Sequence, residues 1–305
     1  MLSLFAGAGG FDLAADQLGW QIVGQSEIYK PGIQVLSHWW PDVPQLGDIT
    51  QIKGTDLDPI DIIVGGFPCQ DLSMAGNRKG LAGARSGLFW EMVRLMAETH
   101  PKWIIAENVV GLLSADDRTA MGTVVGALAE CGYVGAWRVL DAQYFGVPQH
   151  RPRVFIVARH LDAVGPHPAK ILLDETTSTT STRQGQSQKE SRLEPIISRS
   201  SEQNAQIILT QFKSWTSQQA TLKPTTKSNC LLTTAKDGVM IDYPDGDVIV
   251  RQYTPEEREK LMGWPEGHTE PAGSYTARSH LTGNGVATPV AHWIMSRIDA
   301  TQNGI

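Results

Sequence analysis

Short apolar runs alternate with amphipathic segments along the first 160 residues of the chain. Six runs of five to seven residues are predicted to form strands: 1–5 (MLSLF), 21–27 (QIVGQSE), 61–66 (DIIVGG), 102–107 (KWIIAE), 136–142 (AWRVLDA) and 154–159 (VFIVAR). Three segments with apolar residues at helical spacing are predicted to form helices: 11–19, 87–100 and 118–132. Strands that alternate with helices in this way are typical of an α/β fold with a parallel sheet.

The pattern changes after about residue 168. Residues 174–192 are low in complexity and rich in Ser, Thr and Gln, a composition that buries too little apolar surface to form a core. From 193 to 250, short β-like pieces (194–200, 206–212, 229–235 and 247–253) predict a small β-rich domain. Residues 254–265 and 283–298 return to helical periodicity, with Thr254 as N-cap and Pro255 at the first helical position. The sequence therefore predicts that the β-rich segment is an insertion in the α/β part of the chain.

Composition and charge narrow the possible classes of protein. No apolar run among the 305 residues approaches the roughly 18 to 20 that a membrane helix needs, and the N-terminal stretch lacks the basic region of a signal peptide, so we expect a cytoplasmic protein without membrane contact. Three widely spaced cysteines offer neither a disulfide framework nor a zinc-type pair, so we expect no metal. The net charge is −6, but residues 165–236 hold nine Lys or Arg against five Asp or Glu, a local +4 that leaves −10 for the rest.

A glycine-rich stretch lies between the first predicted strand and the first predicted helix, at residues 4–14 (LFAGAGGFDLA). Such a turn lets backbone N–H groups approach a ligand. Glu27 and Asp48 follow at the ends of the next two segments, and an acid at the second strand end is where a doubly wound site holds ribose hydroxyls. Together these features indicate a nucleoside-bearing cofactor.

Reactive side chains follow the later strands. Cys69 lies just after the strand at 61–66, Glu107 ends the strand at 102–107, and Arg151 and Arg153 enter the strand at 154–159. Ligands of open α/β sheets bind at this edge, but a buried small side chain and a nucleophile are equally consistent with the position of Cys69 alone. Glu107 could equally form a surface ion pair. The two arginines alternate along a strand, so both could face one side as a clamp for an anion or carbonyl.

The ordered motifs LFAGAGGF, SEI, GDIT, GGFPCQDLS, ENV, QHRPRVF, RQYTPEEREKLMGWP and GNGV resemble those of cytosine-C5 DNA methyltransferases of the bacterial and phage restriction-modification type. The resemblance covers nearly the whole chain except about 165–248. It implies an α/β, Rossmann-like S-adenosylmethionine-dependent methyltransferase fold with a small, β-containing target-recognition domain inserted. The catalytic domain would comprise 1–164 and 249–305, and the target-recognition domain 165–248.

The resemblance also implies S-adenosyl-L-methionine as cofactor and S-adenosyl-L-homocysteine as its product. The implied pocket residues are Phe5, Gly7, Gly9, Gly10, Glu27, Ile28, Asp48, Ile49, Pro68, Leu88 and Asn284. In this pattern Phe5 stacks on the adenine, Glu27 holds the ribose hydroxyls and Asp48 accepts from the adenine amine. Two positions depart from the family: Ile28 replaces a common aromatic residue, and Glu256 replaces a common arginine, where we expect no catalytic change.

For catalysis, the resemblance implies that the Cys69 thiolate attacks C6 of a flipped-out cytosine, that Glu107 acts at N3 and that Arg153 binds O2. Arg151 supports this geometry or contacts phosphate, and the polar loop at 70–80 closes over the base. The residues implied or proposed to contact DNA are Ser73, Arg85, Arg183, Arg199, Lys213, Lys223 and Lys227. The sequence does not identify the base that removes the C5 proton.

Two other functions fit the same pattern. One is an RNA cytosine-C5 methyltransferase on the same scaffold, and the other is a DNA-binding protein that keeps the fold without the activity. The intact set of Cys69, Glu107, Arg151 and Arg153 favours an active enzyme. We expect double-stranded DNA as the partner, a monomer, and at most a separately acting cognate restriction endonuclease.

Overall fold

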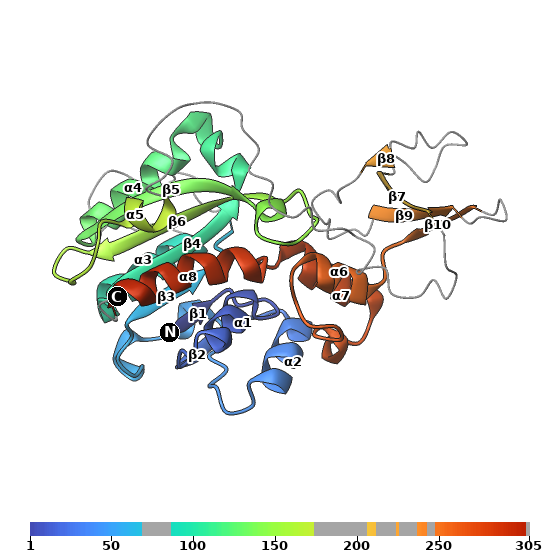
Figure 1. Ribbon diagram of the computed structural model, residues 1–305. Helices are drawn as coiled ribbons and strands as arrows, with labels where there is room; N and C mark the ends of the chain where they lie inside the picture. Colours follow the sequence, from blue (N-terminus) through green and yellow to red (C-terminus); the bar gives the residue numbers. More distant parts are fainter. Residues whose placement is uncertain (69–86, 174–205, 212–223, 226–236, 243–247, 303–305) are drawn as a thin grey trace, which may run out of the picture.

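The computed structural model describes residues 1–68, 87–173, 206–211, 224–225, 237–242 and 248–302 (Figure 1). Its main body is a six-stranded sheet with helices on both faces. The strands are β1 (Leu2–Leu4), β2 (Gly24–Ser26), β3 (Ile62–Gly65), β4 (Trp103–Val109), β5 (Tyr133–Asp141) and β6 (Pro152–His160), in the order β2-β1-β3-β4-β6-β5. All six predicted strands are confirmed.

The prediction of a parallel sheet is wrong for one strand. The neighbouring pairs among β1 to β4 are parallel, but β6 runs antiparallel to both β4 and β5. Only residues 142–151 connect β5 to β6, and a parallel crossover needs about a dozen residues or more. The sheet is therefore mixed, with β6 reversed beside the strand edge that carries Glu107.

Of the eight α-helices in the described ranges, five were expected from the sequence pattern, and α2, α5 and α7 were not. The helices are α1 (Gly10–Gln17), α2 (Lys30–Trp39), α3 (Leu88–Thr99), α4 (Ala120–Glu130), α5 (Pro168–Leu172), α6 (Pro255–Leu261), α7 (Tyr275–Asn284) and α8 (Thr288–Gln302). Short 3-10 helices are η1 (Ile49–Gln51), η2 (Gly54–Asp56), η4 (Val110–Leu113), η5 (Asp116–Arg118), η6 (Ala142–Tyr144) and η8 (Glu270–Ala272). At α6 the predicted start is confirmed, because Thr254 and Glu257 form a capping box and Pro255 opens the helix.

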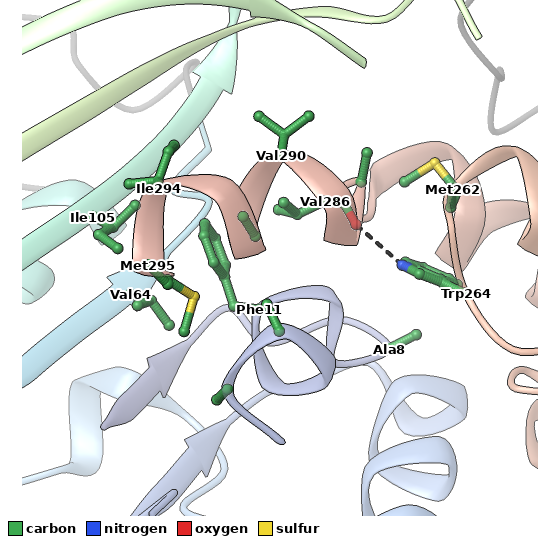
Figure 2. Close-up of a cluster of buried hydrophobic side chains, with 14 of the residues drawn as sticks. Ala8, Phe11, Val64, Ile105, Met262, Trp264, Val286, Val290, Ile294 and Met295 are labelled. Carbon is green, nitrogen blue, oxygen red and sulfur yellow. Dashed lines mark hydrogen bonds between the residues drawn. The ribbon is translucent and has the colours of Figure 1, made fainter. Parts of the chain in front are cut away.

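The sheet separates two apolar clusters. Val64 and Ile105 point to the face covered by α1 and α8, where they pack with Phe11, Ile294 and Met295 (Figure 2). The alternate strand residues point to the other face and pack against α3 and α4. The strands β1 to β4 are thus buried on both sides, and their carboxyl ends are held in fixed relative positions.

A second, four-stranded antiparallel sheet lies beyond α6 and α7 in Figure 1. It comprises β7 (Gln206–Gln211), β8 (Pro224–Thr225), β9 (Asp237–Asp242) and β10 (Val248–Gln252), in the order β10-β9-β7-β8. The strands predicted at 206–212 and 247–253 are confirmed, whereas those at 194–200 and 229–235 lie outside the described residues. Because β10 continues to Gln252, the second sheet extends past residue 248. Helix α5 contacts β5, β6 and α8 and therefore packs with the main sheet.

Candidate active site

The carboxyl ends of β1 to β4 open into one cleft of about 510 Å³, here called the sheet-edge cleft. This is where open α/β sheets bind ligands, at the point where the strand order reverses around β1. Most of the expected pocket residues line it: Phe5, Gly7, Glu27, Ile28, Asp48, Ile49, Pro68, Leu88 and Asn284. Glu107 and Arg153 line it too, so the expected cofactor and base-binding residues share one cavity.

The turn after β1 has an unusual backbone. Phe5 has a φ of +53°, which is uncommon for a residue with a side chain, and Gly7 and Gly9 have φ of +59° and +82°. A Cβ on Gly9 would lie 2.5 Å from the Trp40 ring, and one on Gly10 would lie 2.5 Å from the Val286 carbonyl oxygen. Gly9 and Gly10 are not among the residues that line the sheet-edge cleft. Their missing side chains instead let the start of α1 approach Trp40 and the segment before α8.

Glu27 holds this turn from the end of β2. Its Oε2 accepts a hydrogen bond of 2.7 Å from Gly7 N, and its Oε1 accepts bonds of 2.8 Å from Ile28 N and from Tyr29 N. A carboxylate has about four acceptor positions, so capacity remains for a ligand hydroxyl. Asp48 is exposed and caps η1 with a bond of 2.9 Å from Thr50 N.

Glu107 and Arg153 form a buried ion pair in the sheet-edge cleft. Glu107 Oε1 lies 3.1 Å from Arg153 Nε, and their side chains are only 9% and 14% exposed. Burial raises the pKa of Glu107, and the charges of Arg153 and Arg151 oppose this shift without cancelling it. A carboxyl group of this kind retains its proton at higher pH than an ordinary glutamate and can donate a hydrogen bond into the cleft.

Arg151 has a different environment from Arg153, although we expected both to face one side. Arg151 precedes β6, is 2% exposed, and donates to the carbonyl oxygens of Gly283 at 2.9 Å and Gly285 at 2.6 Å. These two residues flank Asn284 and line the sheet-edge cleft, whereas Arg151 itself does not. Arg151 thus holds the wall of the cleft from behind.

Three polar residues that the sequence analysis did not single out also build the site. Asn108 is buried beside Glu107 and donates a bond of 2.8 Å from Nδ2 to the Phe67 carbonyl oxygen, which fixes the backbone that leads to Pro68. His280 packs its ring 4.7 Å from that of Tyr29, and both line the cleft. Asn108 could have been noted as part of the ENV motif, but nothing in the sequence pattern marks Tyr29 or His280.

Several expected site residues lie outside the part of the chain that the structure describes. They are Cys69, Ser73, Arg85, Arg183, Arg199, Lys213, Lys223 and Lys227. Among the described residues no group of three or more His, Cys, Asp or Glu side chains is placed to hold a metal ion. No helix in those same ranges has the length and apolar character needed to cross a membrane.

Comparison with known proteins agrees with the motif pattern. A family model described as C-5 cytosine-specific DNA methylase matches residues 1–300. The chain is 40% identical over 164 residues to the type II methyltransferase M.NgoFVII of Neisseria gonorrhoeae, which covers 53% of the chain and 44% of that protein. It is 38% identical over 162 residues to the type II methyltransferase M2.BsuMI of Bacillus subtilis, covering 52% and 41%. The match thus spans less than half the length of these curated relatives.

Solved structures match over almost the full length. A DNMT2 mutant of Spodoptera frugiperda superposes with a TM-score of 0.68 at 20% identity, covering 98% of both chains. A putative DNA modification methyltransferase from an E. coli prophage gives 0.68 at 17% identity and covers 99% of both. At these identities the likeness shows the fold alone, and it confirms the expected Rossmann-like methyltransferase fold.

Proposed function

Because the chain belongs to the C-5 cytosine-specific DNA methylase family, we propose that it transfers a methyl group from S-adenosyl-L-methionine to C5 of cytosine in a specific duplex DNA sequence. The observation that carries the proposal is the buried pair of Glu107 and Arg153 in the cleft where β3 leads, through Pro68, to Cys69. A protonated carboxyl beside a guanidinium is what a cytosine ring needs when a nucleophile adds to it.

The chemistry of the sheet-edge cleft fits S-adenosyl-L-methionine. Phe5, Ile28 and Leu88 offer apolar surface for an adenine ring. The carboxylates of Glu27 and Asp48 lie on the same cleft and are suited to accept from ribose hydroxyls and from an adenine amine. The cleft volume of about 510 Å³ lies within the range of cofactor sites, roughly 300 to 1,000 Å³.

The residues of the chain prepare the cytosine for the reaction. The Cys69 thiolate adds to C6, Glu107 donates to N3, and Arg153 places positive charge at O2, so the ring becomes electron-rich at C5. When bound, S-adenosyl-L-methionine supplies an electrophilic methyl group. A base then removes the C5 proton, and the bond between C6 and the Cys69 sulfur breaks by elimination, which restores the aromatic ring.

We propose that the second sheet belongs to a target-recognition domain inserted in the catalytic domain. The basic charge of residues 165–236 and the antiparallel sheet that ends at Gln252 support this division. Phosphate contacts by the lysines and arginines of this segment would position DNA, and flipping the cytosine out would cost a few kcal/mol. We further propose that the protein acts as a monomer and that any cognate endonuclease acts separately.

The proposal is tested by methylation assays with labelled S-adenosyl-L-methionine on duplex DNA and on tRNA, followed by bisulfite sequencing. We expect label only in duplex DNA, at C5 of cytosine in one sequence context. Cys69→Ser should abolish transfer. Cys131→Ser is the matched control, because Cys131 follows α4 and does not line the sheet-edge cleft, so this variant should keep wild-type activity. Label in tRNA alone, or an active Cys69→Ser variant, would contradict the proposal.

A further inference from the structure

The glycine turn of the sheet-edge cleft is held at three points by residues far away in the sequence. Glu27 accepts from Gly7 N at 2.7 Å, and Thr288 donates to the Gly10 carbonyl oxygen at 2.9 Å. Between them, His268 Nε2 lies 2.6 Å from the Ala8 carbonyl oxygen. His268 and Ala8 are both fully buried, so water does not compete for this contact.

The position of the proton on His268 follows from its partner. A carbonyl oxygen only accepts, so Nε2 must carry the hydrogen and Nδ1 must present a lone pair. Nδ1 is buried and has no hydrogen-bond partner among the residues that the structure describes. Burial lowers the pKa of His268, with the bond to Ala8 opposing the shift. The ring is therefore neutral, and its one N–H group is directed at the turn.

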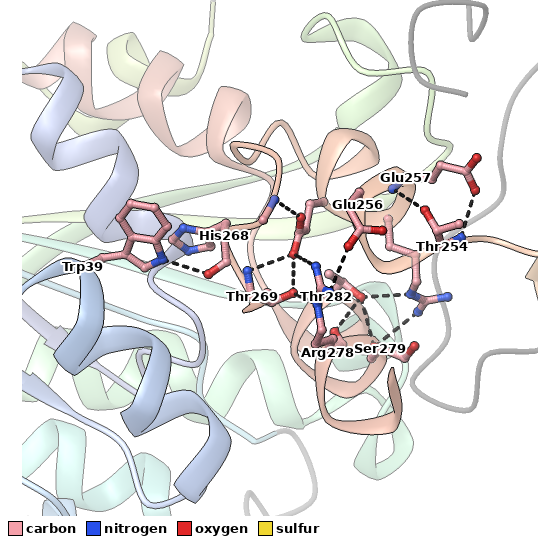
Figure 3. Close-up of polar contacts among 12 residues, drawn as sticks. Trp39, Thr254, Glu256, Glu257, His268, Thr269, Arg278, Ser279 and Thr282 are labelled. Atoms are coloured by element: carbon pink, nitrogen blue, oxygen red, sulfur yellow. Dashed lines mark hydrogen bonds and ion pairs between the residues drawn. The ribbon is translucent and has the colours of Figure 1, made fainter. Parts of the chain in front are cut away.

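The ring of His268 is fixed by three tryptophans. It stacks on Trp39 at 5.5 Å between centroids with an interplanar angle of 19°, and it meets Trp264 and Trp40 edge-on at 5.4 Å and 6.1 Å. Trp39 Nε1 also donates to the His268 carbonyl oxygen at 2.8 Å (Figure 3). The side chain has no room to turn away from Ala8.

The backbone around His268 is fixed by the Glu259 carboxylate of α6. This fully buried group accepts from Gly267 N at 2.7 Å and from Thr269 N at 2.8 Å, the residues on either side of His268. It also pairs with Arg278 of α7 at 2.9 Å. The segment after α6 is thus organised so that one histidine reaches the turn.

We propose that His268 is a positioning residue for the cofactor, and that its Nε2–H group holds the Ala8 carbonyl so that Phe5 and Gly7 face the sheet-edge cleft in the correct backbone conformation. This inference rests on the proposed binding of S-adenosyl-L-methionine there. His268 lies outside the cleft, so it acts on affinity through the turn and not on the reacting atoms.

The test compares His268→Phe, which fills the space without a donor, with His268→Gln, whose amide can still donate. His292→Phe is the matched control, because His292 lies on α8 outside the sheet-edge cleft. Hydrogen exchange of the peptide 5–13 should be faster in His268→Phe and close to wild type in the other two variants. Calorimetry should show S-adenosyl-L-methionine binding about tenfold weaker in His268→Phe, the effect of one lost buried hydrogen bond. At saturating cofactor, kcat should stay within about twofold.

Two results would overturn the inference: unchanged exchange and affinity in His268→Phe, or equal impairment in His268→Gln, which would assign the effect to packing. If the wild-type protein does not bind S-adenosyl-L-methionine, the proposed function fails. The exchange comparison still decides whether His268 holds the turn, because it needs no cofactor.

Discussion

Asp12 on α1 is a buried carboxyl group that joins the two strands leading to Phe5 and Glu27. Its Oδ2 accepts from Ser3 Oγ on β1 at 2.9 Å, and its Oδ1 accepts from Gln25 Nε2 on β2 at 2.8 Å. Burial raises the pKa of Asp12 from 3.8 to about 6, although both hydrogen bonds oppose the shift. We therefore expect Asp12 to make the stability of the protein depend on pH near neutrality.

The sign and size of this dependence follow from the pKa. The pKa of Asp12 is higher in the folded state than in the unfolded state, so the folded state binds more protons at pH values between the two. The contribution of Asp12 to the free energy of unfolding is therefore fully present below about pH 3.8 and is lost as pH rises through about 6. At 1.36 kcal/mol per pKa unit the whole contribution is about 3 kcal/mol, of which about 1.3 kcal/mol is lost between pH 5 and pH 7.

The substitution Asp12→Asn removes the titration and keeps both contacts, because the amide oxygen can accept from Gln25 and the amide nitrogen can donate to Ser3. The free energy of unfolding is measured by urea unfolding, followed by tryptophan fluorescence, at pH 5, 6 and 7. The value for Asp12→Asn minus that for the wild type should increase by about 1.3 kcal/mol from pH 5 to pH 7. Ser3→Ala is the matched control, since it loses one hydrogen bond but keeps the carboxyl and should follow the wild-type slope. Parallel profiles for wild type and Asp12→Asn would refute the reasoning.

Three further predictions concern the reaction. Glu107→Gln should lower kcat by about 10² to 10⁴-fold with little change in cofactor affinity measured by calorimetry. The wild-type rate should fall as rising pH removes the proton from Glu107, and the rate of the variant should not show this decrease. Asn108→Ala should slow covalent trapping on 5-fluorocytosine duplex DNA by about tenfold, because Phe67 loses its hydrogen bond; unchanged trapping would remove Asn108 from the site. DNA affinity should fall steeply with salt in a filter-binding titration, and a flat response would argue against phosphate contacts by residues 165–236.

The sequence pattern predicted those features that depend on apolar periodicity. The strands β1, β3, β4 and β6 and the helices α1, α3, α4 and α8 each bury a regular apolar face, so their spacing marks them, whereas α6, which buries Glu257, Arg258 and Glu259, is marked by Thr254 and Pro255 at its start. Helix α7 has no such face. It buries Arg278 and Thr282, whose side chains bind α6, and Ser279, whose carbonyl oxygen accepts from Arg258 of α6 at 3.2 Å (Figure 3), so hydrophobic periodicity could not reveal it.

At the site, the motifs placed Glu27, Asp48, Glu107 and Arg153 on one cleft, but they could not show what each side chain contacts. The separation of Arg151 from Arg153 depends on where β6 begins, and element boundaries are the least certain part of a sequence prediction. The roles of Gly9 and Gly10 depend on Trp40 and Val286, which pack against them from distant parts of the chain.

The wall of the sheet-edge cleft depends on buried polar contacts from the C-terminal part of the chain. Arg151 binds the carbonyl groups on either side of Asn284, and the fully buried Glu259 with its partner Arg278 holds the segment that carries His268. A buried charge that loses its partner is strongly destabilising, so such a network permits few alternative arrangements. Since Phe5 already has a strained backbone, the turn that carries it needs this rigid support to keep one conformation. The residues proposed for chemistry and those that support them therefore lie in different parts of the sequence, and a substitution in α6 or α7 should act first on cofactor affinity.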